Sequence, residues 1–139
     1  MRTRDDIEAY LSRSGHPYRE LDESTWLVRD PSGLGQGSDG ENIIVRMAGE
    51  LVIFRVKVLE LSQIDTKRRE AFFADLLSFN ANDMVHGAYG ISGDTKTGTI
   101  LLTSSLRLEN LDYNELIGTL DDFGVALAKH MSRISSYKA

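Results

Sequence analysis

The chain has 139 residues, a net charge of −5 and no cysteine. This length is typical of one domain and buries enough surface to fold without covalent cross-links. The absence of cysteine excludes disulfide bonds and thiolate metal sites. The surface charges are interspersed, and the densest basic run is only Lys67-Arg68-Arg69, so the composition disfavours nucleic-acid binding.

The apolar residues of the sequence are not arranged as in a membrane protein. Residues 1–14 contain arginines and acidic residues but no apolar run of the kind that directs secretion. The longest apolar-rich run, residues 51–61, is interrupted by Arg55, Lys57 and Glu60 and is too short for a membrane span. We therefore expect no membrane partner and a cytoplasmic location.

The first half of the chain predicts one helix followed by four strands. Thr3 is a suitable N-cap for a helix over residues 3–14, and Gly15-His16-Pro17 ends that helix. Four strands follow, and the tight connections at residues 22–24 and 48–49 call for antiparallel pairing, whereas a longer glycine-rich loop is expected over residues 30–40. The strands are expected over residues 18–21, 25–29, 41–48 and 50–59.

The second half predicts a helix, a hairpin and a longer helix. Thr66 is the expected N-cap of a helix over residues 66–80. A polar, glycine-containing loop then joins two strands. These strands are expected over residues 86–92 and 98–106.

The last helix is the longest and begins with a clear signal. Asp112 and Glu115 have the spacing of a capping box, and apolar residues recur at helical spacing as far as Ile134. Residues 135–139 are expected to be irregular. The order α-β-β-β-β-α-β-β-α predicts an α+β fold, a twisted antiparallel sheet flanked by helices, with residues 1–139 as a single domain.

The fourth strand shows which of its faces belongs to the core. Alternate residues on one side are all apolar, as expected of a buried face, and these are Val52, Phe54, Val56 and Val58. The other side mixes apolar and cationic residues. A mixed face of this kind is typical of a sheet surface that is half covered or offered to a partner.

No motif for catalysis or cofactor binding emerges. Residues 35–40 match the letters G-x-G-x-x-G, but a strand follows them where a dinucleotide site needs a helix N-terminus. We interpret this segment as a strand connection. Adjacent Asp121 and Asp122 diverge by about 100° on a helix and are expected to form a solvated face. No cofactor is expected.

The three histidines lack the spacing of a metal site. His16 falls in a turn, His86 at a strand start and His130 near the end of the last helix, without a second ligand at i+4. His130 is expected at the surface. His86 is the one catalytic candidate, and a hydrogen-bonded histidine at a strand end is the simpler interpretation. No metal is expected.

Four short motifs carry a family resemblance. They are Phe73-x-x-Leu76-Leu77-x-x-Asn80, Gly87-Ala88-Tyr89-Gly90, Gly98-x-Ile100-Leu101-Leu102 and Leu111-Asp112-x-x-Glu115-Leu116. With the order of elements, they make the chain resemble the type III secretion chaperone-like superfamily, which includes the Tir-chaperone and YbjN families. The resemblance implies a small, acidic, cytoplasmic homodimer that holds an extended segment of a client protein on its sheet.

The leading hypothesis is therefore a non-enzymatic, dimeric, chaperone-like protein-binding module. The alternative is a regulatory protein of the sensory transduction type that binds a small ligand or a signalling partner. The expected partner-binding residues are Trp26, Leu27, Leu51, Ile53 and Arg55. The expected dimer interface uses the middle helix or the last helix, where a helix-interior glycine suggests close approach of another element. Its candidates are Phe72, Phe73, Leu76, Gly124 and Ala128.

Overall fold

The computed structural model describes residues 1–29 and 41–139 and confirms the predicted order of elements. Six strands form one sheet in the order β1-β2-β3-β4-β6-β5, and every neighbouring pair is antiparallel. The strands are β1 Tyr18–Asp22, β2 Thr25–Arg29, β3 Glu41–Ala48, β4 Leu51–Glu60, β5 Ala88–Ser92 and β6 Thr99–Arg107. The helices are α1 Arg4–Ser14, α2 Arg69–Asn82 and α3 Tyr113–Ser135, with short 3₁₀ turns at Leu61–Gln63 and Thr66–Arg68.

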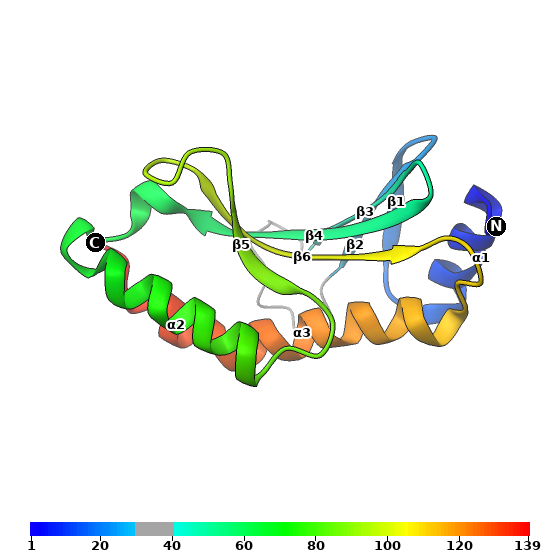
Figure 1. Cartoon of the computed structure of the whole chain (residues 1–139). Coiled ribbons are helices and arrows are strands. Elements are labelled where there is room, and N and C mark those ends of the chain that lie inside the picture. Colours follow the sequence, from blue (N-terminus) through cyan, green and yellow to red (C-terminus); the bar gives the residue numbers. More distant parts are fainter. Residues whose placement is uncertain (30–40) are drawn as a thin grey trace.

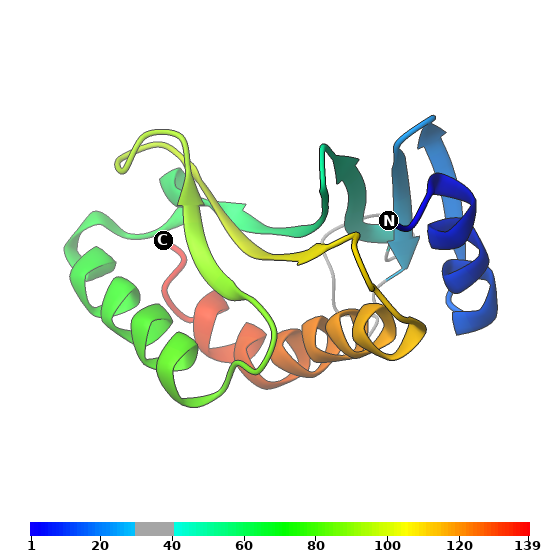
Figure 2. The ribbon, with the colours of Figure 1, turned by 45° about the vertical axis from the view of Figure 1, so that its right-hand side comes forward.

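The helices lie on one side of the sheet. Figure 1 shows α2 and α3 side by side along the lower face, and α1 at the end of the sheet near β1 and the start of α3. Figure 2 shows from a second angle that the opposite face of the sheet has no described helix over it. The fold is therefore an open α+β sheet with one covered face and one helix-free face.

The core fills the space between the sheet and α3. The predicted inward residues of β4 are all buried, and Phe54 packs edge-on against Phe123 of α3 with ring centroids 6.5 Å apart. The predicted stripe of α3 is buried at Leu116, Leu120, Phe123, Leu127 and Ile134 and half-buried at Met131. The capping box is present, since the Asp112 side chain accepts from the backbone N–H of Glu115 at 2.8 Å.

The start of α2 and the end of α3 differ from the prediction. Thr66 does not cap the middle helix, because Asp65 caps a 3₁₀ turn there and α2 begins at Arg69. Ser135 belongs to α3, whereas residues 136–139 are irregular as predicted and are nevertheless held in place, because Lys138 forms an isolated β-bridge with Ile64. Tyr137 is buried, its hydroxyl bonds the carboxylate of Asp75, and its ring packs against the core. A tyrosine that reaches back to α2 thus ties down the end of the chain.

Candidate functional site

The helix-free face brings together most of the predicted partner-binding residues. The register places Leu27 of β2 opposite Ile44 of β3, and Ile44 opposite Arg55 of β4. Side chains directly opposite one another point to the same face of a sheet. Leu51 and Ile53 share this face by alternation along β4. The predicted group therefore forms one contiguous surface, apart from Trp26.

Trp26 does not belong to this surface. It pairs with Val45 of β3, which in turn pairs with Phe54 of β4, and all three lie in the core. The Trp26 side chain is 0 % exposed, so it cannot reach a partner in this fold. Its size is better explained by packing on the helix side of the sheet.

The structure adds two residues that the sequence analysis missed. Ile44 and Arg46 of β3 line a shallow depression together with Ile53 and Arg55. Ile44 is 41 % exposed and Leu51, at the end of β4, is 38 % exposed. The period-two pattern of β3 contained this signal, because burial of Ile43 and Val45 places the alternate residues Ile44 and Arg46 on the opposite face.

A second apolar surface lies between α2 and the edge strand β5. It is lined by Phe73, Leu76, Leu77, Asn80, Tyr89, Gly90 and Ile91. The family motif around α2 thus has a structural meaning, since its apolar residues form one wall of this groove. Asn80 makes two hydrogen bonds to Tyr89, accepting from its backbone N–H at 2.7 Å and donating to its carbonyl at 3.1 Å. The Asn80 amide thus takes both outward-facing backbone groups of Tyr89 on the free edge of β5, and it fixes the width of the groove between α2 and β5.

The residues predicted for a dimer interface are separated by the structure. Phe73 and Leu76 line the α2–β5 groove, with Leu77 beside them 68 % exposed. Phe72 is fully buried against Tyr137 and cannot reach a second molecule. On α3, Gly124 is buried and Ala128 is exposed.

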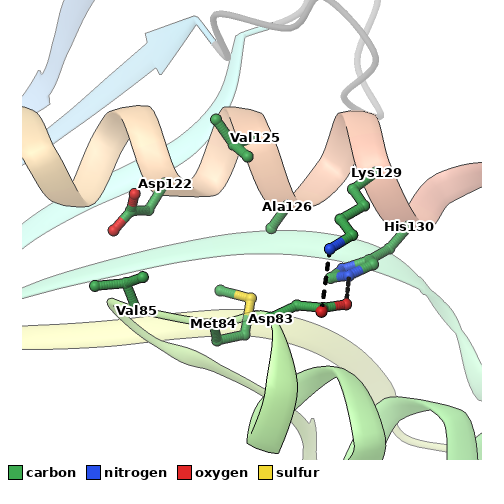
Figure 3. Close-up of a pocket in the computed structure, with 8 residues that line it drawn as sticks. All are labelled: Asp83, Met84, Val85, Asp122, Val125, Ala126, Lys129 and His130. Carbon is green, nitrogen blue, oxygen red and sulfur yellow. Dashed lines mark hydrogen bonds and ion pairs between the residues drawn. The ribbon is translucent and has the colours of Figure 1, made fainter.

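His130 was expected at the surface, and this prediction was wrong. Its side chain is 2 % exposed and stacks on Phe79 with ring centroids 3.9 Å apart. Figure 3 shows how the ring on α3 meets Asp83 at the end of α2. Its Nε2 donates to the Asp83 carboxylate at 2.7 Å, and in the neutral ring Nδ1 accepts from the Tyr89 hydroxyl at 2.7 Å. The Lys129 ammonium donates to the other Asp83 oxygen at 3.1 Å.

The pKa shifts in this network indicate a structural role and not a catalytic one. Burial, with a smaller effect from the charge of Asp83, raises the pKa of Tyr89 far above that of an ordinary phenol. The hydroxyl therefore stays protonated and does not act as a nucleophile at neutral pH. The hydrogen bond from His130, followed by that from Lys129, lowers the pKa of Asp83. The network joins the end of α2 to both β5 and α3.

The other two histidines also meet carboxylates of α3. His86 contacts Asp122, and Nε2 of His16 lies 3.5 Å from Asp121. The adjacent aspartates were expected to be a solvated face; Asp121 is exposed as predicted, Asp122 is half-buried, and each also pairs with a histidine. Both pairs are partly exposed, and His86 precedes β5 instead of lying in it. The pairs join the loops before β1 and β5 to α3.

Within the described residues, no cluster of three or more metal-ligating side chains is present. The glycine pattern at residues 35–40 lies outside the described residues. Among the described helices, none combines the length and apolar composition that crossing a membrane requires.

Comparison with solved structures supports the fold. YbjN from E. coli, described as a putative transcription regulator, superimposes with a TM-score of 0.69 at 12 % identity, covering 95 % of this chain and 93 % of that one. An uncharacterized protein from Methanothermobacter thermautotrophicus gives 0.67 at 14 % identity, covering 98 % and 99 %. A chain of the heterodimeric ExoU–SpcU complex from the type III secretion system of Pseudomonas aeruginosa gives 0.54 at 16 % identity, covering 95 % and 97 %.

Comparison with curated proteins gives no match. The family comparison is positive over the whole chain, since the model of the CesT_Tir_1 family, a type III chaperone family, matches residues 1–139. These residues include both walls of the α2–β5 groove and the complete helix-free face. The chain therefore belongs to the CesT_Tir_1 family and has the type III secretion chaperone-like fold.

Proposed function

We propose that this protein is a non-enzymatic, chaperone-like binding module that holds an extended segment of a partner protein on the helix-free face of its sheet. One observation carries the proposal: apolar side chains of neighbouring strands, Ile44, Leu51 and Ile53, lie on a face that no described helix covers. Adjacent apolar residues left open on a sheet are typical of a binding surface. Family membership supports this function, as does the ExoU–SpcU complex among the structural neighbours.

An extended segment fits this face better than a compact ligand does. The depression among Ile44, Arg46, Ile53 and Arg55 is shallow and has a volume of about 170 Å³. Small-molecule sites are deeper and usually enclose about 300–1,000 Å³. An extended chain laid over the sheet can fill this shallow depression and contact the strands beside it, because its side chains alternate like those of the strands. The cytoplasm is the compartment we propose for this interaction.

Selection from a random peptide library on the immobilised protein tests this function. We expect peptides whose binding is lost in the Leu51→Ser/Ile53→Ser variant and retained in Val85→Ser. Val85 is a suitable control, because it is an apolar side chain, 79 % exposed, that lies beside the His130 network away from the sheet face. Peptides that bind the sheet-face variant as tightly as the wild type would contradict the proposal.

We further propose that two copies associate through the α2–β5 groove. The β5 sequence, AYGIS, contains none of the charges or prolines that usually protect an edge strand, whereas β1 at the other edge reads YRELD. Because Asn80 occupies the edge of β5 at Tyr89, two copies related by a two-fold axis would meet through side chains, and the exposed Leu77 would cover the same side chain of its partner. Phe73, Leu76 and Ile91 complete the apolar lining.

Sedimentation equilibrium tests this association. We expect a dimer at micromolar concentration that dissociates in Leu77→Glu and persists in Val125→Glu. Both side chains are exposed apolar residues on helices, at 68 % and 65 %, and only the first lies in the groove. A wild-type monomer, or equal dissociation of both variants, would refute the interface.

The regulatory alternative is favoured less by the structure. A small ligand between the sheet and α3 would have to displace the packed rings of Phe54 and Phe123. The pocket beside His130, shown in Figure 3, has a volume of only about 90 Å³. A regulator with this fold would therefore act through a protein partner, and a thermal-shift screen in which one metabolite raises the melting temperature would contradict this reasoning.

A further inference from the structure

The helix-free face carries a charge opposite to that of the whole chain. The net charge is −5. On this face, however, the register places Arg46 opposite Ile53, Arg55 opposite Ile44 and Arg107 opposite Leu51. All three arginine side chains are exposed. The surface that we propose as the partner-binding site is therefore cationic as well as apolar.

Nearby carboxylates neutralise only part of this charge. Glu60 forms an ion pair with Lys57 at the far end of β4, at 2.5 Å. The pKa of Asp22 is lowered mainly by the backbone N–H of Ser24, and the charge of Arg46 contributes less. Among ion pairs between described residues, none includes Arg46, Arg55 or Arg107. These guanidinium groups keep their capacity to bind an anionic group.

The positions of Arg46 and Arg55 define a spacing. They are diagonal neighbours on β3 and β4, because Arg46 is opposite Ile53 and Arg55 lies two residues further along β4. Diagonal neighbours in an antiparallel sheet are separated by about 7–8 Å. In an extended chain, residues i and i+2 point to the same side and lie about 6.7 Å apart. Two carboxylates at i and i+2 therefore match the two guanidinium groups, and each such contact can be bidentate.

The other diagonal of the same depression is apolar. Ile44 and Ile53 lie between the arginines and line the same hollow. The aromatic side chains of the described strands, Tyr18, Trp26, Phe54 and Tyr89, pack in or against the core on the opposite face. The helix-free face therefore lacks the aromatic side chains on which single-stranded nucleic acids stack. A peptide segment fits this chemistry better than a nucleic acid.

Building on the proposed function, we propose that the preferred partner segment is acidic. It is extended, with carboxylates two residues apart over Arg46 and Arg55, and the methylene groups of these acidic side chains lie against Ile44 and Ile53. The acidic residues would make the interaction depend on salt, because these arginines are exposed.

Fluorescence anisotropy with three labelled peptides of equal length tests this assignment. One peptide carries two glutamates at i and i+2 among valines and serines, the second carries them at i and i+1, and the third replaces both with glutamine. We expect the first to bind about tenfold more tightly than either of the others. This preference should disappear in Arg46→Gln/Arg55→Gln. It should persist in Lys67→Gln/Lys96→Gln, which changes the net charge equally at exposed positions outside the sheet.

Each contradictory result would overturn a different part of the proposal. If the acidic and neutral peptides bind equally and both require Leu51 and Ile53, the acidic preference is wrong and the proposed function stands. If the i,i+1 peptide binds as well as the i,i+2 peptide, the spacing is wrong. If a single-stranded oligonucleotide binds more tightly than any peptide and requires Arg46 and Arg55, the peptide assignment is overturned. If library-selected peptides also ignore the sheet-face variant, the proposed function itself fails.

Discussion

Removing the Tyr89 hydroxyl tests how much the buried network contributes to stability. Tyr89→Phe keeps the ring in place, so it creates no cavity, but it leaves Nδ1 of the buried His130 without its 2.7 Å hydrogen bond. A buried polar atom that loses its partner costs about 1–3 kcal/mol. For a chain of this size, each kcal/mol lowers the melting temperature by roughly 3–5 °C. We therefore expect a decrease of about 3–15 °C.

Thermal and urea unfolding followed by circular dichroism measure this effect. Tyr113→Phe is the matched control, because its ring contacts Tyr10 and Arg13, while its hydroxyl makes no hydrogen bond to a described residue. We expect this variant to change stability by less than about 0.5 kcal/mol. If Tyr89→Phe is no more destabilising than Tyr113→Phe, the network is not a stabilising element and the reasoning fails.

Two further predictions concern the same region. Gly87 has a φ of 98°, and a Cβ there would lie 2.7 Å from a backbone oxygen of β6. Gly87→Ala should therefore destabilise the fold by about 1–3 kcal/mol in urea unfolding. A Cβ at Gly90 would meet nothing within 4 Å, so the control variant Gly90→Ala should be nearly neutral. The pKa of Asp83 is lowered in the folded state, so its carboxylate contributes to the free energy of unfolding. This contribution is fully present above the unfolded-state pKa of about 3.9 and is lost as the pH falls through the lower folded-state pKa. Asp83→Asn should therefore lose less stability on acidification than the wild type, and equal acid sensitivity of the two proteins would contradict the role of the His130 hydrogen bond.

Much of the fold could be predicted because its signals are local. The alternation in β4 identified the core face correctly, since one side is entirely apolar whereas the other mixes apolar and cationic residues. The Asp112–Glu115 capping box depends on residues three positions apart and was also recovered. The family motifs were recognised from sequence as well, although only the structure shows that the α2 motif lines a groove.

The errors concern residues whose environment depends on distant parts of the chain. His130 lies beside the apolar stripe of α3, and its burial depends on Asp83 and Tyr89, which come from other elements. Trp26 and Leu27 are both large and apolar, so their strand alone does not show which one faces the helices. The register against Val45 decides it, and that register involves β3, a strand that follows residues 30–40. Local pattern thus determined the elements, whereas tertiary contacts determined the exposed surface.

The central claim is that the helix-free face holds the partner segment, and nuclear magnetic resonance tests it most directly. Backbone amide shifts of the labelled protein should be recorded while a library-selected or i,i+2 acidic peptide is added. We expect the largest shifts at Leu27, Ile44, Arg46, Ile53 and Arg55, which share that face. Shifts concentrated along α2 and β5, or in the pocket beside His130, would contradict the account.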